Sequence, residues 1–457
     1  MNGASADPIP IHAGESASAW LHADVQTDAE HEVRRAVLEI IDRVRKEGDI
    51  ALLDLAERYE SGRPDSLLVP RATCDAALAG LPDERRSALE IAARNIRRFH
   101  EGQIVEDPAV AVMPGVTAWR EFRPIDRIGV YAPGGRAAYP SSVLMSVVPA
   151  RLAGVREIAL CCPAGSDGLP PEAVLAACAL LEVDELFAVG GAQAIAAMAL
   201  GTQTIRPVDK IFGPGSAWVN EAKLALFADV EIDLPAGPSE VVVWADSSAD
   251  PRLVAAELVA QCEHGPDSIS VCVFSDDGER AGNRLMQLAE ATVKAVRQAL
   301  DELEAAHSDA IRLGRPIEAA RTSLAGSAIL CADSDAVGAE WVNQLAGEHL
   351  VVLRREARRD LASIRHAGSV FLGPWTPVAA GDYASGTNHV LPTRRRAKAA
   401  SGLGVADFGR WLQVQELSLE GLRSLGPTIE ILALWEGLPA HAASIRARFP
   451  DAGPVTP

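Results

Sequence analysis

The sequence lacks the features that mark nucleic-acid-binding, disulfide-stabilised and membrane proteins. Its 43 Lys and Arg residues stand against 62 Asp and Glu residues, a net charge of −19 that argues against a surface built for phosphate backbones. The seven cysteines show no CxxC pair and no regular spacing, which fits a reducing compartment. No stretch approaches the roughly 18 apolar residues of a membrane helix, and the N-terminus does not resemble a secretory signal. We expect a soluble cytoplasmic protein without nucleic-acid or membrane partners.

Apolar residues make up 48% of the chain, enough for a large core. Short apolar runs alternate with alanine-rich helical segments from Arg127 onward, a pattern typical of βαβ units and a parallel sheet. Two sets of runs occur: 128–131, 157–161 and 185–189, and then 240–244 and 269–274. Amphipathic helices are expected over 27–60 and 83–100, and a mostly helical tail follows Gly402. The polar residues 1–24 are interpreted as a flexible leader.

Three glycine-rich turns follow predicted strands, at 133–135, 190–193 and 213–215. Such turns bring backbone N–H groups close to a phosphate at a helix N-terminus. None completes a GxGxxG fingerprint, and no Walker A motif occurs. The turns are equally compatible with ordinary tight βα connections.

Four segments concentrate side chains that bind metals or transfer protons: 261–267, 347–350, 381–392 and 436–441. Gln261 and His264 are three residues apart and share one face at a predicted helix end, whereas Cys262 points elsewhere. Glu348 and His349 form a potential proton-transfer pair, although neighbours in a strand reach one site only where the backbone is irregular. A capping histidine and a surface ion pair are the alternatives. These patterns favour an α/β enzyme with a metal site of nitrogen and oxygen ligands.

Read together, these segments resemble the histidinol dehydrogenase family over roughly residues 25–448. The resemblance depends on short strings that occur in order along the chain: 131–135 (YAPGG) with 138–142 (AYPSS), 189–194 (VGGAQA), 213–215 (GPG), 236–240 (AGPSE), 263–267 (EHGPD), 348–350 (EHL), 381–383 (GDY) with 387–392 (TNHVLP), and 436–438 (EGL) with 440–441 (AH). Each string is unspecific alone, but the ordered set is specific.

The resemblance implies zinc-dependent oxidation of L-histidinol to L-histidine in two NAD-dependent steps through histidinaldehyde. It also implies an α/β fold of two incomplete Rossmann-like parallel-sheet domains, similar to aldehyde and histidinol dehydrogenases, with a small helical C-terminal extension. The expected limits are 25–130 with 239–400 for the first domain, 131–238 for the second, and 401–457 for a tail that crosses to the partner in a homodimer.

The resemblance also assigns roles to individual residues. The implied zinc ligands are Gln261, His264, Asp382 and His441. Glu348 and His349 are the implied catalytic pair, His349 as the base for the alcohol and Glu348 for the addition of water to the aldehyde. The implied substrate contacts are Ser239, His389 and Glu436, together with Gln261, His264, His349, Asp382 and His441. Tyr131, Gln193 and Ser216 are the implied NAD contacts.

The sequence departs from the family pattern at three places. Ser216 stands where asparagine is usual, Gly347 where proline is frequent, and the basic run 394–396 follows the polar loop. Two alternatives therefore stay open: a related zinc- and NAD-dependent dehydrogenase of another amino- or sulfo-substituted alcohol, and a binding protein without redox chemistry.

Overall fold

The computed structural model describes residues 7–21, 29–104, 107–134, 138–235, 237–277, 281–306 and 314–449. Gly135, Ala236, His307 and parts of the expected leader (1–6 and 22–24) lie outside the described residues. The chain divides into two compact units, residues 1–103 with 125–407 and residues 104–124 with 408–457, and each is described by itself.

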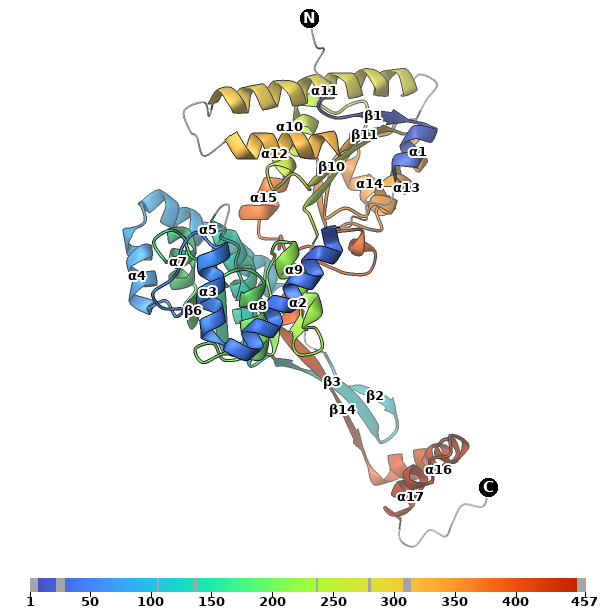
Figure 1. Cartoon of the computed structure of the whole chain (residues 1–457). Helices are drawn as coiled ribbons and strands as arrows, with labels where there is room; N and C mark the ends of the chain where they lie inside the picture. Colours follow the sequence, from blue (N-terminus) through green and yellow to red (C-terminus); the bar gives the residue numbers. More distant parts are fainter. Residues whose placement is uncertain are drawn as a thin grey trace, which may run out of the picture. The chain divides into compact units, whose positions relative to one another are not determined.

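A parallel sheet in the first unit carries strands from both ends of this unit's sequence. Within the described residues it has six strands, in the order β1-β11-β10-β9-β12-β13. Figure 1 shows β1, in dark blue, beside β11. The strands are β1 (Ile11–Ala13), β9 (Glu240–Ala245), β10 (Ile269–Phe274), β11 (Ala328–Cys331), β12 (His349–Leu353) and β13 (Ser369–Leu372). The central strands are buried on both faces, which explains their continuous apolar runs.

Helices cover this first sheet on both faces. Helix α10 begins at Pro251, where the Asp250 side chain accepts a hydrogen bond from the backbone N–H of Arg252. The helices of this part are α1 (Glu15–Leu21), α10 (Pro251–Cys262), α11 (Ala281–Ala306), α12 (Gly314–Ala325), α13 (Asp335–Leu345), α14 (Ala357–Asp360) and α15 (Val378–Tyr383), with the 3₁₀ turns η1 (Leu361–Ser363), η2 (Arg396–Lys398) and η3 (Val405–Phe408).

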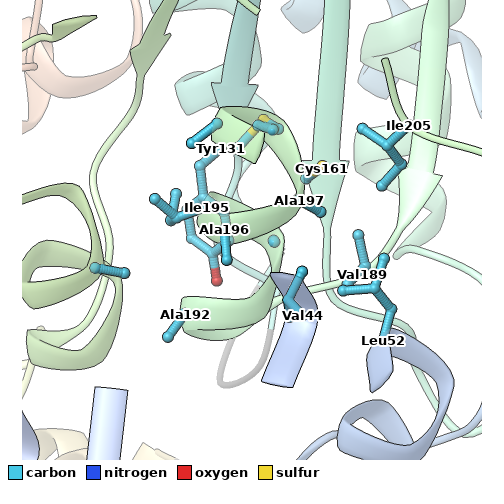
Figure 2. Packing of buried hydrophobic residues seen from close by; sticks show 14 of the residues in the cluster. Val44, Leu52, Tyr131, Cys161, Val189, Ala192, Ile195, Ala196, Ala197 and Ile205 are labelled. Carbon is cyan, nitrogen blue, oxygen red and sulfur yellow. The ribbon is translucent and has the colours of Figure 1, made fainter. Parts of the chain in front are cut away.

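A second parallel sheet in the same unit has the order β6-β5-β4-β7-β8 among the described strands. Its strands are β4 (Arg127–Tyr131), β5 (Glu157–Cys162), β6 (Glu185–Ala188), β7 (Lys210–Phe212) and β8 (Glu231–Ile232). Its helices are α2 (Ala29–Glu47), α3 (Asp49–Tyr59), α4 (Arg71–Gly80), α5 (Asp83–Glu101), α6 (Pro140–Ala153), α7 (Glu172–Leu180), α8 (Gly191–Leu200) and α9 (Ala217–Ala225). Helix α8 is alanine-rich and almost wholly buried, so that it packs closely against the sheet (Figure 2).

The second unit joins the hairpin within residues 104–124 to the C-terminal part of the chain. Its described strands form an antiparallel sheet in the order β14-β3-β2. Trp119 of β3 pairs with Val414 of β14. The elements are β2 (Val110–Met113), β3 (Val116–Pro124), β14 (Gly409–Leu417), α16 (Leu419–Trp435) and α17 (Pro439–Arg446).

The α/β class with two parallel sheets is confirmed. The observed limits differ from the predicted ones in three respects. Residues 11–21, expected in a flexible leader, form β1 and α1, because β1 pairs with β11. Helices α2 to α5 pack with the second sheet rather than the first, since the apolar face of α2 contacts α8 and α9. The tail, expected to be mostly helical, begins with β14, and residues 104–124 belong with it.

No helix in the described ranges is both long and apolar enough to cross a membrane.

Candidate active site

Glu348 and His349 are held together by the backbone of one residue, Glu240. The Glu348 carboxylate accepts a hydrogen bond from the Glu240 N–H (2.9 Å), and His349 Nδ1 donates to the Glu240 carbonyl (3.1 Å). Both side chains are buried, and Glu348 Oε2 lies 3.5 Å from His349 Nδ1. The irregular backbone that this convergence requires is present at Ala346, which has φ of 45°. Glu348 and His349 therefore reach one site although they are neighbours in sequence.

The turn before Glu348 is tightly packed at Gly347, where a side chain would require Val242 to shift. A Cβ atom on Gly347 would lie 2.7 Å from Val242 Cγ2. The carbonyl groups of Gly347 and Glu348 accept hydrogen bonds from the N–H groups of Gly368 and Ser369, at 3.0 and 2.9 Å. The segment is thus fixed by packing and by strand pairing.

Asp382 connects the proton-transfer pair to the polar loop. Its Oδ1 lies 3.3 Å from His349 Nε2, and its backbone carbonyl accepts a hydrogen bond from His389 Nδ1 (2.9 Å). Asp382 lies in α15, whose first N–H, that of Val378, donates to Glu257 Oε2 (3.1 Å). The carboxylate is thereby placed among the imidazoles of His264, His349 and His389, whose charges lower its pKa against the opposite effect of burial.

Gln261 and His264 lie at the end of α10, as the sequence predicted. Gln261 is buried, and its Nε2 makes no hydrogen bond with any described residue. Cys262 faces the core, where its Sγ lies 3.2 Å from Ser270 Oγ. His264 is exposed, but protein atoms around its imidazole still lower its pKa, and the nearby Asp382 carboxylate opposes this shift.

The environment shifts the pKa values of the pair in a way typical of catalytic groups. Burial raises the pKa of Glu348 to about 7, and the neighbouring Glu240 and Asp382 carboxylates add to this effect. Burial alone would lower the pKa of His349, but the Asp382 carboxylate, 3.3 Å from Nε2, and the charge of Glu348 raise it to about 9. Burial lowers the pKa of His389.

The group gathers at the amino ends of parallel strands. Glu240 is the first residue of β9 and His349 the first of β12, and the two strands are neighbours. Ser239 immediately precedes β9, and its carbonyl accepts a hydrogen bond from the Ile269 N–H (3.0 Å). In open α/β sheets ligands usually bind at the carboxyl ends. This group of side chains lies instead at the edge formed by the amino ends of the strands.

Two predicted site residues belong to the second unit. Glu436 follows α16 directly, and His441 lies in the first half of α17. Both are exposed. They are thus presented on a surface of their own unit, and their place in the site remains a prediction.

The predicted NAD contacts follow strands of the second sheet at its carboxyl ends. Tyr131 ends β4, and its hydroxyl accepts a hydrogen bond from the Gly191 N–H (3.2 Å) at the start of α8. Figure 2 shows the Tyr131 side chain beside Ala192 and Ile195 of α8. Gln193 is buried in the first turn of that helix, and Ser216 is exposed directly before α9. The three residues thus lie at or after the carboxyl ends of three strands of one sheet, β4, β6 and β7.

The turn before Ser216 is fixed by a buried ion pair. Lys223 donates to the Gly213 carbonyl (2.6 Å) and to the Asp233 carboxylate, which also accepts from the Gly213 N–H (2.7 Å). Both side chains of the pair are 1% exposed. Gly213 has φ of 110°, and a Cβ there would lie 2.1 Å from the Tyr131 carbonyl, so that only glycine fits.

The ligand candidates of the first unit fit a zinc ion in their chemistry. Gln261, His264 and Asp382 supply nitrogen and oxygen donors of the kind that zinc accepts. The buried Gln261 Nε2 donor lacks an acceptor among the described residues, so a bound group with an acceptor would satisfy it, while the amide oxygen is the atom suited to a metal ion. Within the described residues no three His, Cys, Asp or Glu side chains form a metal-binding group.

Three acidic residues at these sites escaped the sequence reasoning. Glu240 holds Glu348 and His349, Glu257 accepts the first N–H of α15, and Glu60 contacts Gln193. Glu257 lies one helical turn before Gln261, so helical spacing was a signal for it. Glu60 has no such signal, since its partners lie more than 100 residues away in sequence.

The fold and the site together define an α/β enzyme with a buried carboxylate–imidazole pair. The family model for histidinol dehydrogenase matches residues 23–449. The histidinol dehydrogenase of Vibrio cholerae is 43% identical over 421 residues, 91% of this chain and 92% of the relative. That of Halobacterium salinarum is 44% identical over 95% of this chain and 96% of the relative. The crystal structure of histidinol dehydrogenase from Elizabethkingia anophelis superposes with a TM-score of 0.88 at 34% identity, over 97% of this chain and 98% of that one.

The chain belongs to the histidinol dehydrogenase family. The resemblance inferred from the ordered strings is thereby confirmed.

Proposed function

We propose that this chain oxidises L-histidinol to L-histidine through histidinaldehyde, with NAD as hydride acceptor in both steps and one zinc ion per subunit. The observation that carries the proposal is the buried pair Glu348 and His349, held by both backbone groups of Glu240. An alcohol oxidation requires a base, and an aldehyde oxidation requires activated water. The pair offers one group for each requirement. The relatives that align over more than nine-tenths of the chain support the same reaction.

His349 acts as the base of the first step in this proposal. Its Nδ1 faces a carbonyl oxygen, which only accepts hydrogen bonds, so Nδ1 carries the hydrogen. Nε2 is then the nitrogen that gains and loses a proton. It takes the proton of the histidinol hydroxyl group while a hydride passes to NAD from the carbon that bears this group.

Glu348 acts on water between the two steps. One carboxylate oxygen, Oε2, is held by the Glu240 N–H, which leaves Oε1 for the water. Glu348 takes a proton as the water adds to the aldehyde carbonyl, and the carbonyl oxygen takes the proton that His349 gained in the first step. The resulting hydrate is again an alcohol, and His349 removes its proton as the second hydride leaves. Water thus supplies the second carboxylate oxygen of histidine.

Gln261, His264 and Asp382 would hold zinc together with His441. When bound, zinc would orient the substrate through its imidazole and amino nitrogens. Ser239 and His389 would contact the substrate beside it, and the Glu436 carboxylate would pair with the substrate ammonium group. Tyr131, Gln193 and Ser216 would contact NAD.

A homodimer with shared sites completes the proposal. Glu436 and His441 belong to the second unit, and the tail of one chain would supply them to its partner. Helix α16 of this unit exposes apolar side chains, among them Trp435, which is 84% exposed. A second copy of the chain would cover such a face. We also propose a cytoplasmic location, since all seven cysteines are free and buried.

The test is an assay of the zinc-supplemented protein with L-histidinol and NAD. We expect two NADH formed per histidinol consumed, with histidine as the product. A failure to reduce NAD with histidinol would contradict the proposal. A panel of other amino- and sulfo-substituted alcohols would then distinguish a different substrate from a binding protein without redox chemistry.

A further inference from the structure

Glu60 connects two loops at the carboxyl edge of the second sheet. It follows α3, and its Oε1 accepts hydrogen bonds from the Gly190 N–H (2.9 Å) and from Gln193 Nε2 (3.0 Å). Its Oε2 accepts from the Ala164 N–H (3.0 Å). Ala164 follows β5, and Gly190 follows β6. One carboxylate therefore fixes the backbone of both loops and the amide of a predicted NAD contact.

This carboxylate occupies a position that phosphates take in many dinucleotide-binding proteins. Gly190 directly precedes α8, and the N-terminus of a helix after a glycine-rich turn attracts anions. Here the Gly190 N–H is bonded to Glu60, and the Gly191 N–H is bonded to the Tyr131 hydroxyl. The chain supplies its own anion, so that these N–H groups are not available to a ligand phosphate.

The same contact determines the orientation of the Gln193 amide. A carboxylate oxygen only accepts, so the amide atom that faces Glu60 is the NH₂ group. The carbonyl oxygen Oε1 is then the free end of the amide, and it makes no hydrogen bond with any residue that the structure describes. Gln193 is only 3% exposed, but its Oε1 is not among the fully buried side-chain atoms without a partner in the described residues, so this oxygen keeps access to a ligand that brings a donor.

We propose that Glu60 is a positioning residue for the cofactor: it fills the α8 N-terminus in place of a ligand phosphate and turns the Gln193 carbonyl oxygen toward a hydroxyl or amide donor of NAD. This inference rests on the proposed contact between Gln193 and NAD. It explains why the 190–193 turn is rich in glycine yet does not complete a phosphate-binding fingerprint. According to this inference, the 190–193 turn contacts the sugar or carboxamide groups of the dinucleotide and not its pyrophosphate.

The test is a fluorescence titration of the full chain with NADH in the absence of histidinol. Glu60→Gln places an amide where three N–H donors converge, so one donor must meet another. We expect the dissociation constant for NADH to rise about tenfold, with the KM for histidinol and the zinc content unchanged. Glu57→Gln is the matched control, because Glu57 lies in α3 just before Glu60, is 66% exposed and pairs only with Arg63 among the described residues. It should bind NADH as the parent protein does.

A double-mutant cycle separates positioning from a general structural role. If Glu60 acts through Gln193, Glu60→Gln should weaken NADH binding much less in a Gln193→Ala background. Equal effects in both backgrounds, or unchanged binding by Glu60→Gln, would overturn the inference. Glu60→Asp keeps the charge and should bind NADH more tightly than Glu60→Gln, and equal weakening by both would count against the role of the carboxylate.

The cycle also distinguishes the inference from the proposed function. Normal NADH binding by Gln193→Ala would refute the Gln193 contact and this inference with it, while histidinol oxidation by the parent protein would still stand. Loss of histidinol oxidation in the parent protein would refute the function, and NADH binding by the variants would still be measurable.

Discussion

His349 Nε2 and Asp382 Oδ1 lie 3.3 Å apart, and this contact joins the proposed proton-transfer pair to the proposed zinc ligands. In the proposed function the Asp382 carboxylate would have two roles. It would orient the His349 imidazole through Nε2, and it would bind zinc together with Gln261 and His264. Proton transfer and metal binding would then be coupled through a single side chain, so substitutions of either group test the proposal.

His349→Ala should reduce turnover of histidinol by a factor of 10² or more, because general-base catalysis contributes about 10²–10⁴ in rate. Its zinc content should stay unchanged, since His349 is not among the proposed ligands. The measurements are steady-state NADH formation and metal analysis. His366→Ala is the matched control, because His366 lies outside the site and is expected to leave both quantities intact. Normal turnover by His349→Ala would refute the assigned role.

Glu348→Gln should stop the reaction after one oxidation. An amide at this position still bonds to the Glu240 N–H but cannot take a proton from water. We expect close to one NADH per histidinol instead of two, with histidinaldehyde as the released product. Single-turnover assays with product analysis measure this ratio. Two equivalents at the parental rate would show that another group activates the water.

Coexpression of His349→Ala with His441→Ala tests the shared site. Each variant alone should be inactive. If the tail of one chain completes the site of the other, the mixed dimer has one intact site of its two, and random mixing gives about a quarter of the parental activity. No recovery in a verified mixed dimer would mean that each tail serves its own chain.

Lys223→Met should destabilise the chain by about 3–5 kcal/mol, because it leaves the Asp233 carboxylate buried without its partner. Both side chains are 1% exposed and hold the Gly213 turn. The midpoint of urea unfolding measures the loss. Lys46→Met is the matched control, since Lys46 is 70% exposed and pairs with Asp42 at the surface. A similar midpoint for both variants would contradict the importance of the buried pair.

His100 should make stability depend on pH below neutrality. Burial lowers its pKa, and its Nδ1 bonds to the Ile96 carbonyl (2.8 Å) while Asn388 Nδ2 lies 3.4 Å from Nε2. The unfolded chain thus binds the proton more readily than the folded chain. The contribution to stability is complete above the unfolded pKa of about 6.5 and is lost as pH falls from there toward the folded pKa.

The measurement for His100 is the free energy of unfolding of the parent protein and of His100→Gln between pH 7.5 and 5. The parent should lose stability more steeply over this range, since the variant cannot take up the proton. Parallel curves would show that His100 does not contribute to the pH dependence.

The order of motifs along the chain was enough to predict the family and both parallel sheets, because apolar runs and glycine turns are local signals. It was also enough to place Glu348 and His349 at a strand start. The roles of Glu60 and Glu240 were not predictable, because their contacts join segments far apart in sequence. The second unit was not predicted for the same reason, because β3 and β14 pair across a long separation in sequence. The sequence of the tail mainly shows the helical pattern of α16 and α17.

The pairing of Trp119 with Val414 also has a consequence during synthesis. When β3 leaves the ribosome, its partner strand is still about 300 residues from being made, a separation that slows folding. One edge of β3 stays open for this whole interval, and open strand edges recruit other chains. A truncated chain that ends before β14 therefore keeps an unprotected edge permanently. Such fragments should aggregate in cells, whereas a chain that includes β14 can pair this edge of β3.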